Sequence, residues 1–193
     1  MRYDAGHAES ETHVHRWRRL PCAEPGRVPA TIFENSADHV AVEQLLTAGC
    51  DAVPVRLLAF CRMPNRWHLV LCPQADGYLS VFIHRLTMIH TTRWHLAHRS
   101  PGSGPLPQGR FKSFPVANDE HFLTVCRYFE RNPLRANLVG RAENWRWWSL
   151  WHRLNPSNFV GFADWPIVPS GNWVERVNEP QTEAELAALH NSV

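Results

Sequence analysis

Apolar residues recur along the central part of this chain with two spacings, one typical of helices and the other of strands. Residues 35–49 carry a partial apolar face at helical spacing, with Asn35 or Ser36 as the cap and Gly49 as the end. Residues 78–99 show the helical period more clearly. We therefore expect two helices, the second long and amphipathic, with a basic outer face that an ordinary solvated surface would also explain.

A β-hairpin is predicted between these helices. Segments 53–63 and 66–73 are rich in strand-forming residues, and a Pro-Asn turn dipeptide separates them. Side chains alternate in direction along a strand, so Arg66 and His68 should point to the same face of the sheet.

Two more elements follow a loop of Gly, Pro and Ser. Residues 110–116 alternate as a strand, which places Arg110 and Lys112 together on one side. Residues 118–132 have helical spacing, and the proline that follows them should stop this helix.

The helix over residues 118–132 carries a candidate for chemistry. Tyr128 and Asn132 are four residues apart and therefore lie on one face. A phenol with a pKa of about 10 needs local activation to act as a nucleophile, for example by a cation bound to Asn132 and to His68. Taken alone, a helical tyrosine is more often a partly buried core residue, and that alternative stays open.

Composition describes a globular protein without deciding its function. The 193 residues are 44% hydrophobic and 20% charged, which allows one well-buried domain, and the formal net charge is +2. Lys112 is the only lysine; an Arg-, His- and Trp-rich surface suits nucleic acid, but a GC-rich genome explains the same bias.

The five cysteines are scattered, as is typical of reduced thiols. No stretch has the length of a membrane span, so we expect a cytoplasmic protein without a membrane partner.

Several stretches of this sequence resemble one known family. They are "LLAFCRMPNRWHLVLCP", "GRFKSFPV", "DEHFLTVCRYFERNPLRANLV", "WRWWSLW" and "NWVERVNEPQTEAEL". Together they look like the REP-associated tyrosine transposases of the single-tyrosine HUH group, named for two histidines around a bulky hydrophobic residue. The resemblance is near-continuous from about residue 32 to the C-terminus, and its most specific part is residues 127–139.

The resemblance implies both a fold and a reaction. The fold is α+β, with a central antiparallel sheet of the ferredoxin-like, HUH-transposase type packed with helices, and a Trp- and Pro-rich C-terminal extension. These proteins bind single-stranded DNA hairpins of repetitive extragenic palindromes and cut beside them, giving a 5′-phosphotyrosine and a free 3′-hydroxyl. By motif, Tyr128 is the nucleophile, while His68 and Asn132 are ligands of a divalent ion, Mg²⁺ or Mn²⁺.

For contacts with DNA phosphates we expect Arg110, Lys112, Arg127 and Arg131, although Arg131 could equally pair with a carboxylate such as Glu130. Such contacts position a strand without specifying its sequence. The oligomeric state stays open, with a monomer slightly favoured.

The chain departs from the family motif at Arg66, which stands where the first histidine is normal. A guanidinium group has no lone pair to offer, and its charge opposes a nearby cation. We therefore expect metal binding to be weakened or lost, and Arg66 could contact the phosphate in the ion's place. His13 and His15 form a second His-x-His sequence, but they lack the hairpin context and are not expected to replace the pair.

Three regions are expected along the chain. They are an irregular N-terminal segment over 1–30, the catalytic domain over 31–150, and a C-terminal extension over 151–193 that contains a helix begun by a capping box at 182–185. Relatives have a strand in the first region, whereas its residues here do not alternate convincingly, so whether it supplies a strand of the sheet stays open.

The leading interpretation is a DNA transposase that cleaves and joins hairpin single strands through Tyr128, with its activity in doubt because of Arg66. The alternative from another class is a catalytically inactive protein that binds hairpin DNA. A degraded gene product without a stable fold and a metal hydrolase unrelated to DNA are weaker alternatives.

Overall fold

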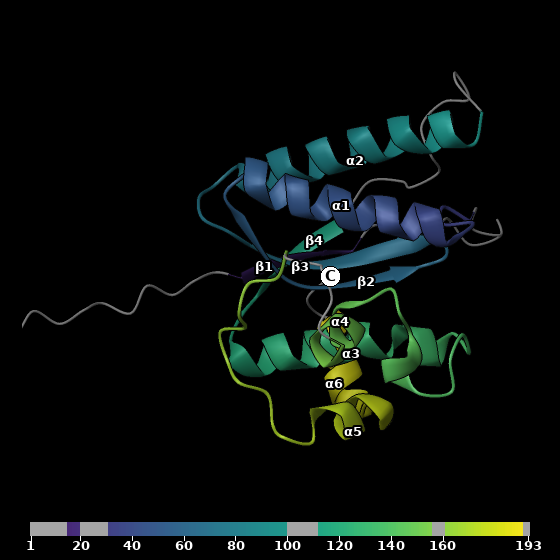
Figure 1. The fold of residues 1–193 in the computed structure, drawn as a ribbon. Helices are drawn as coiled ribbons and strands as arrows, with labels where there is room; N and C mark the ends of the chain where they lie inside the picture. The colour runs from purple at the N-terminus through teal and green to yellow at the C-terminus, as the bar shows by residue number, and fades with distance from the viewer. Residues whose placement is uncertain (1–14, 20–30, 100–111, 156–160, 191–193) are drawn as a thin grey trace, which may run out of the picture.

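The computed structural model describes residues 15–19, 31–99, 112–155 and 161–190, with the backbone alone at 15–19 and at three further positions. Within these residues a four-stranded antiparallel sheet lies between two layers of helices (Figure 1). The expected class, an α+β protein with a central antiparallel sheet packed with helices, is confirmed.

The strands of this sheet are spread along the described chain. They are β1 (His15–Arg19), β2 (Val55–Met63), β3 (Arg66–Pro73) and β4 (Lys112–Val116), in the spatial order β2-β3-β1-β4. Each neighbouring pair is antiparallel. The predicted hairpin is β2–β3, and the strand predicted over 110–116 is β4.

Strand β1 lies inside the segment 1–30 that we expected to be irregular, and it corrects that expectation. It occupies an inner place in the sheet, with Trp17 opposite Val70 of β3 on one side and opposite Phe114 of β4 on the other. Backbone hydrogen bonds to two neighbouring strands therefore keep this segment extended, although its side chains do not alternate clearly.

Helices α1 (Ser36–Ala52) and α2 (Tyr78–Ala97) cover one face of the sheet and form an apolar core with it. Asn35 caps α1 by accepting hydrogen bonds from two first-turn N–H groups at 2.8 and 3.2 Å. Gly49 was expected to end α1 but lies inside it. A Cβ atom at this position would come within 3.0 Å of the Phe82 ring, so the glycine permits the close approach of α2.

Helix α3 (Asp119–Arg135) packs on the opposite face, and it runs through Pro133, where we expected it to stop. The proline has no N–H group for the carbonyl four residues earlier. Backbone bonding resumes directly after it, with the Ala136 N–H donating to the carbonyl of Asn132 at 3.0 Å. Pro133 and Phe129 are both buried. Burial of this face against the sheet therefore outweighs the lost hydrogen bond.

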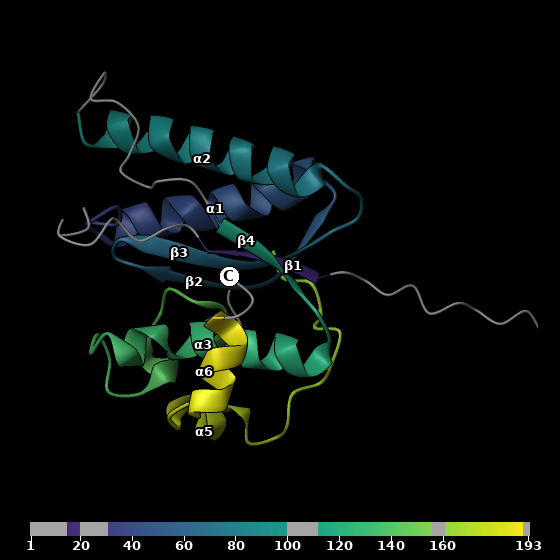
Figure 2. The same cartoon turned by 180° about the vertical axis from the view of Figure 1, so that it is seen from behind.

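Short helices complete the described chain: α4 (Ser149–Leu154), α5 (Trp173–Asn178) and α6 (Glu183–His190), with a 3₁₀ turn before α4. Helix α5 lies beyond α3 from the sheet, and α6 contacts α3 as well (Figure 2). The boundary that we placed after residue 150 falls inside α4. No helix in the described part of the chain is both long and apolar enough to cross a membrane.

The predicted capping box at the start of α6 is formed. The Thr182 N–H donates to the Glu185 carboxylate at 2.8 Å, and the Glu185 N–H donates to the Thr182 hydroxyl at 3.2 Å. These two bonds satisfy backbone donors that the first helical turn leaves without partners.

The Trp-rich part of the chain covers the outer edge of β2. Nε1 of Trp145 donates to the carbonyl of Arg62 at 2.9 Å, and Nε1 of Trp165 donates to the carbonyl of Leu58 at 2.8 Å. The Arg62 N–H in turn donates to the carbonyl of Trp147 at 3.0 Å. An open edge strand would offer these groups to other chains, so the indoles and the neighbouring backbone protect β2 from edge-to-edge association.

Arg62 is a fully buried cation of β2 that α1 neutralises. Its guanidinium group donates to the carboxylate of Glu43 and to the backbone carbonyl of His39. A buried charge is tolerated when it is paired and hydrogen-bonded, so these contacts attach α1 to the hairpin.

Candidate functional site

Strand β3 presents Arg66 and His68 to the face of the sheet that α3 covers. Val70 and Cys72, at the next even positions, belong to the core on the α3 side. His68 is 1% exposed, and its ring stacks on Phe129 of α3 with centroids 4.6 Å apart and planes at 29°. The imidazole therefore lies on the same face of the sheet as the helix that carries the tyrosine.

Helix α3 places Tyr128 and Asn132 next to Phe129. Tyr128 is half-buried against the core, and the guanidinium carbon of Arg135 lies 4.7 Å from the centroid of its ring. Asn132 is 4% exposed, and its Nδ2 has no hydrogen-bond partner among the described residues. A buried amide without a partner costs free energy, so packing alone does not explain this asparagine.

The structure thus places His68 of β3 against the turn of α3 that carries Tyr128 and Asn132. Phe129 contacts His68 directly, follows Tyr128 in the sequence, and lies one helical turn before Asn132. Tyr128 is the partly exposed member, while the imidazole and the amide are buried beneath the surface. Tyr128 can therefore present its hydroxyl group to a molecule that binds at the surface.

The side chains at this junction do not fit a divalent cation well. His68 and Asn132 offer one imidazole and one amide, whereas Mg²⁺ prefers several oxygen ligands. Arg66, on the same face of β3, adds a positive charge. Cys61 lies opposite His68 in the hairpin register, but burial raises the pKa of its thiol, which stays protonated and poorly suited to a metal. Among the described residues, no group of three or more His, Cys, Asp or Glu side chains could hold a metal ion.

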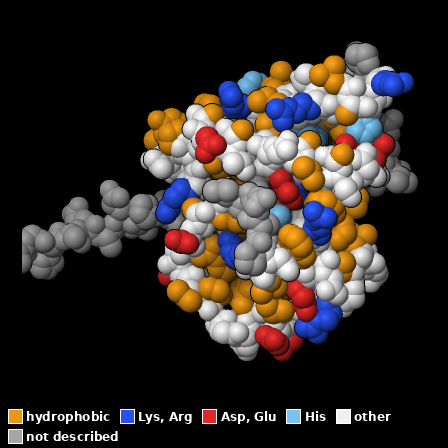
Figure 3. All heavy atoms as spheres, in the orientation of Figure 1, with side chains coloured by type: hydrophobic (Ala, Val, Ile, Leu, Met, Phe, Trp, Pro, Cys, Tyr) orange, Lys and Arg blue, Asp and Glu red, His pale blue; other side chains and the backbone are white. Residues whose placement is uncertain are grey.

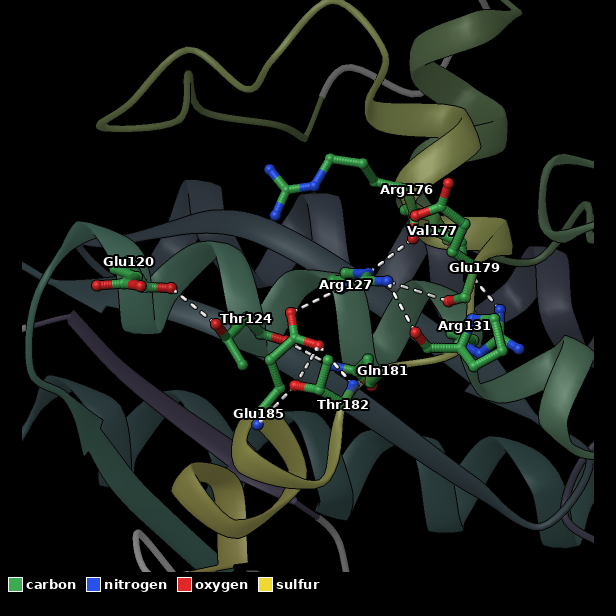
Figure 4. Close-up of polar contacts among 11 residues, drawn as sticks. Glu120, Thr124, Arg127, Arg131, Arg176, Val177, Glu179, Gln181, Thr182 and Glu185 are labelled. Carbon is green, nitrogen blue, oxygen red and sulfur yellow. Dashed lines mark hydrogen bonds and ion pairs between the residues drawn. The ribbon is translucent and has the colours of Figure 1, made fainter.

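Arg127 was expected to contact DNA, but the structure shows it binding the C-terminal part of the chain (Figure 4). Nε of Arg127 donates to the carbonyl of Arg176 at 2.6 Å, and Nη1 donates to the carboxylate of Glu185 at 2.6 Å. Nη2 donates to two further carbonyls at 3.1 and 3.2 Å. The guanidinium group is buried by these contacts and is not free for a phosphate.

Arg131, whose DNA contact stays a prediction, also binds the C-terminal part of the chain through Nη1. It donates to the carbonyl of Val177 at 3.0 Å and to the carbonyl of Asn178. These groups lie at the C-terminal end of α5, where helix carbonyls lack partners and the helix dipole favours a cation. The two arginines of α3 therefore cap α5 from outside its own sequence.

Four other residues named from the sequence are beyond what the structure can place. Arg110 and His13 lie outside the described residues. For Lys112 and His15 the structure describes the backbone alone, in β4 and β1 respectively.

Glu130 is a fully buried acid on α3 that the sequence analysis considered only as a partner of Arg131. Its Oε2 accepts a hydrogen bond from Nε1 of Trp173 at 2.7 Å. Burial raises the pKa of Glu130 to about 7, against the opposing effect of the Arg153 cation. The sequence gives no sign of this, because residues that are far apart in the chain surround the acid.

We expect Arg127→Ala to lower the free energy of unfolding by about 3 kcal/mol, because Glu185 and three carbonyls lose their donor. Amide hydrogen exchange over residues 173–190 should become faster, as measured by mass spectrometry. Arg176→Ala is the control, since it keeps the backbone carbonyl and removes only a partly exposed side chain. Unchanged exchange in Arg127→Ala would show that another contact holds this segment.

Glu130→Gln should become more stable than the parent protein as the pH rises. Below a pH of about 4.5 the carboxyl is protonated in both states; between about 4.5 and 7 the unfolded chain loses the proton and the folded chain keeps it. The parent's stability therefore falls over this range and levels off above it, while the amide does not titrate. The variant's advantage should grow by on the order of 2 kcal/mol between about pH 5 and pH 8. Urea unfolding at both values measures it, and a constant difference would contradict the burial of an ionisable acid.

No model of a known protein family matches this sequence, and a search of curated proteins finds no similar sequence. Among solved structures, the fold is similar to that of a REP-associated tyrosine transposase bound to a REP hairpin. The TM-score is 0.58 and the sequence identity 12%, over 89% of this chain and 94% of the other. The comparison therefore shows a shared fold along most of both chains.

Proposed function

We propose that this protein binds folded single-stranded DNA on a tyrosine-transposase fold, and that Tyr128 is the residue that cuts and rejoins the strand. The observation that carries the proposal is the stacking of His68 on Phe129, which joins the motif strand to the segment of α3 that holds Tyr128 and Asn132. An imidazole pointing to the other face of the sheet would have separated the motif from the tyrosine.

The topology of the sheet supports this proposal. The elements follow the order β1-α1-β2-β3-α2-β4, and the strand order is β2-β3-β1-β4. This is the β-α-β-β-α-β arrangement of a ferredoxin-like sheet, which the resemblance of the sequence to HUH transposases also requires. Since the solved structure with the similar fold is bound to a REP hairpin, we propose a DNA hairpin as the partner here.

The proposed reaction is a transesterification at a backbone phosphate. The Tyr128 hydroxyl gives up its proton and attacks phosphorus, so that a tyrosine O–P bond forms while the bond to the 3′ oxygen breaks. The leaving oxygen takes up a proton and becomes a 3′-hydroxyl, and the phosphate stays on the tyrosine. The guanidinium group of Arg135, stacked on the tyrosine ring, is placed to attract the phosphate.

We propose further that a divalent cation is bound weakly or not at all at this junction. Arg66 is partly exposed and shares the His68 face of β3, so it can contact the phosphate that a cation would otherwise neutralise. An arginine supplies charge and a fork of N–H donors, but it has no lone pair and cannot act as a Lewis acid. Cleavage should therefore be slower than in a chain with both motif histidines.

A second candidate is hairpin binding without cleavage. Two observations favour it: Arg66 occupies a motif position, and the His68 ring is covered by Phe129. Tyr128 and Asn132, which a binding protein would not need, favour the first candidate.

A covalent adduct between protein and a labelled hairpin, seen on a denaturing gel, is the expected result for the first candidate. Tyr128→Phe should abolish the adduct, because phenylalanine has no hydroxyl to attack phosphorus. Tyr78→Phe, at the start of α2, is the matched control and should keep it. Hairpin binding without an adduct would select the second candidate, and a protein that neither binds nor reacts would refute both.

Arg66→His is expected to raise adduct formation in Mn²⁺ by about tenfold, because it restores an imidazole donor and removes a charge that opposes the cation. Arg66→Ala, which removes the charge without adding a donor, is the control. If the parent already reacts well and Arg66→His gains nothing, the view that Arg66 impairs the site is wrong.

A further inference from the structure

Three arginines on α2 and directly after it differ from the other arginines of the described chain. Arg85 and Arg93 are exposed on α2, and Arg99 is exposed just beyond its C-terminal end. Among the described residues, none of their three guanidinium groups has a polar, ionic or ring contact. Every other arginine whose side chain is described has at least one such contact. The arginines that are available to a partner therefore gather on one helix.

Helix α2 offers these arginines no counter-charge of its own. Between Tyr78 and Ala97 the sequence contains no aspartate or glutamate. At a rise of about 1.5 Å per residue, Arg85 and Arg99 lie about 20 Å apart along the helix axis. Figure 3 shows basic side chains spread along the top of the molecule, over α2, with hydrophobic side chains between them. The outer face of α2 is therefore a row of positive charge that suits an extended anion.

Arg99 occupies a backbone conformation that an arginine rarely adopts. Its φ is +50°, in the left-handed region. A Cβ atom makes this conformation unfavourable, so glycine or asparagine is the usual residue after the end of a helix. The other described non-glycine residue with a positive φ is Asn137, which follows this rule. The backbone thus does not favour an arginine at position 99, and its exposed cation needs another reason.

Aliphatic side chains on the same surface narrow the choice of partner. Val81, Met88 and Leu96 are 54%, 56% and 71% exposed. They have no ring to stack on unpaired bases, as proteins that bind single strands do. The apolar side that a helix on a membrane surface would bury in lipid carries Phe82 and Leu86, and here it lies in the core. Double-stranded DNA fits better, because its major groove accepts a helix and gives thymine methyl groups to aliphatic side chains.

We infer that the outer face of α2 binds the double-stranded stem of a DNA hairpin, with Arg85, Arg93 and Arg99 on its phosphates. This inference rests on the proposed function, which supplies the hairpin. The span from Arg85 to Arg99 corresponds to about six base pairs, at about 3.4 Å each. Because α2 and α3 cover opposite faces of the sheet, α2 holds a part of the DNA other than the phosphate that Tyr128 attacks (Figure 1, Figure 2).

The salt dependence of hairpin binding tests this inference. Fluorescence anisotropy of a labelled hairpin gives the affinity of the full chain at several KCl concentrations. Each phosphate contact with a duplex contributes about 0.9 to the slope of log affinity against log salt. Arg85→Gln and Arg99→Gly should each lower this slope by about 1 and weaken binding in about 0.1 M KCl by roughly tenfold. The parent's slope in both variants would overturn the inference.

Two controls separate binding from folding and from a general effect of charge. Arg99→Gly places glycine at a positive φ, so its thermal midpoint should equal or exceed the parent's, and weaker binding cannot then come from unfolding. Arg141→Gln removes another exposed arginine, which is paired with Glu143 and lies beside the 3₁₀ turn, away from α2. It should keep the parent's slope and affinity. An equal fall in slope in Arg141→Gln would overturn the inference.

Two other ligands test the assignment to a double-stranded stem. An unpaired DNA strand of the same length should bind the parent and Arg85→Gln equally well, and an equal loss for this strand and for the hairpin would overturn the assignment. Vesicles that contain phosphatidylserine should bind neither protein. Vesicle binding that Arg85→Gln loses, with unchanged hairpin binding, would assign α2 to a membrane surface instead.

Failure of this inference is distinguishable from failure of the proposed function. A parent that forms the Tyr128 adduct, with α2 variants that keep its salt slope, would refute this inference alone. A parent that forms no adduct, with α2 variants that lose slope on the hairpin, would sustain this inference and refute cleavage. A parent that binds no hairpin would refute the proposed function and this inference with it.

Discussion

The packing of α3 between the sheet and the C-terminal part of the chain is the contact on which the rest of the structure depends. One side of the helix buries Phe129 against His68 of β3, and the opposite side gives Arg127 and Arg131 to the carbonyl end of α5. A helix that is anchored on two sides cannot rotate about its axis. Tyr128, which lies between these sides, therefore points in a direction that tertiary packing determines.

Much of the fold could be predicted because its signals are local. The hairpin, α2 and the capping box at the start of α6 follow from periodicity and capping chemistry within a few residues. The helix ends expected at Gly49 and Pro133 were wrong, because packing against Phe82 and against the sheet outweighs the usual effect of glycine and proline. Strand β1 was missed because two neighbouring strands provide its hydrogen bonds.

In the candidate site, too, local features could be predicted from the sequence and contacts between distant residues could not. The shared direction of Arg66 and His68 follows from the period of a strand, which is a local property. The contacts of Arg127 and Arg131 are with backbone carbonyls 46 to 53 positions further along the chain. From the sequence alone these carbonyls are unknown, so a basic residue beside a candidate nucleophile suggests a phosphate contact instead. Glu130 escaped notice for the same reason, since an acid on a polar helix carries no local sign of burial.

Two buried ionisable side chains show two ways in which the fold accommodates a polar group away from water. Arg62 is matched by the carboxylate of Glu43, so its burial serves to attach α1 to the hairpin. Glu130 is bonded by the indole of Trp173 and by the Ser149 hydroxyl, and burial raises its pKa to about 7. Arg62 is therefore kept charged by a paired carboxylate, whereas the buried Glu130 is accommodated by a raised pKa.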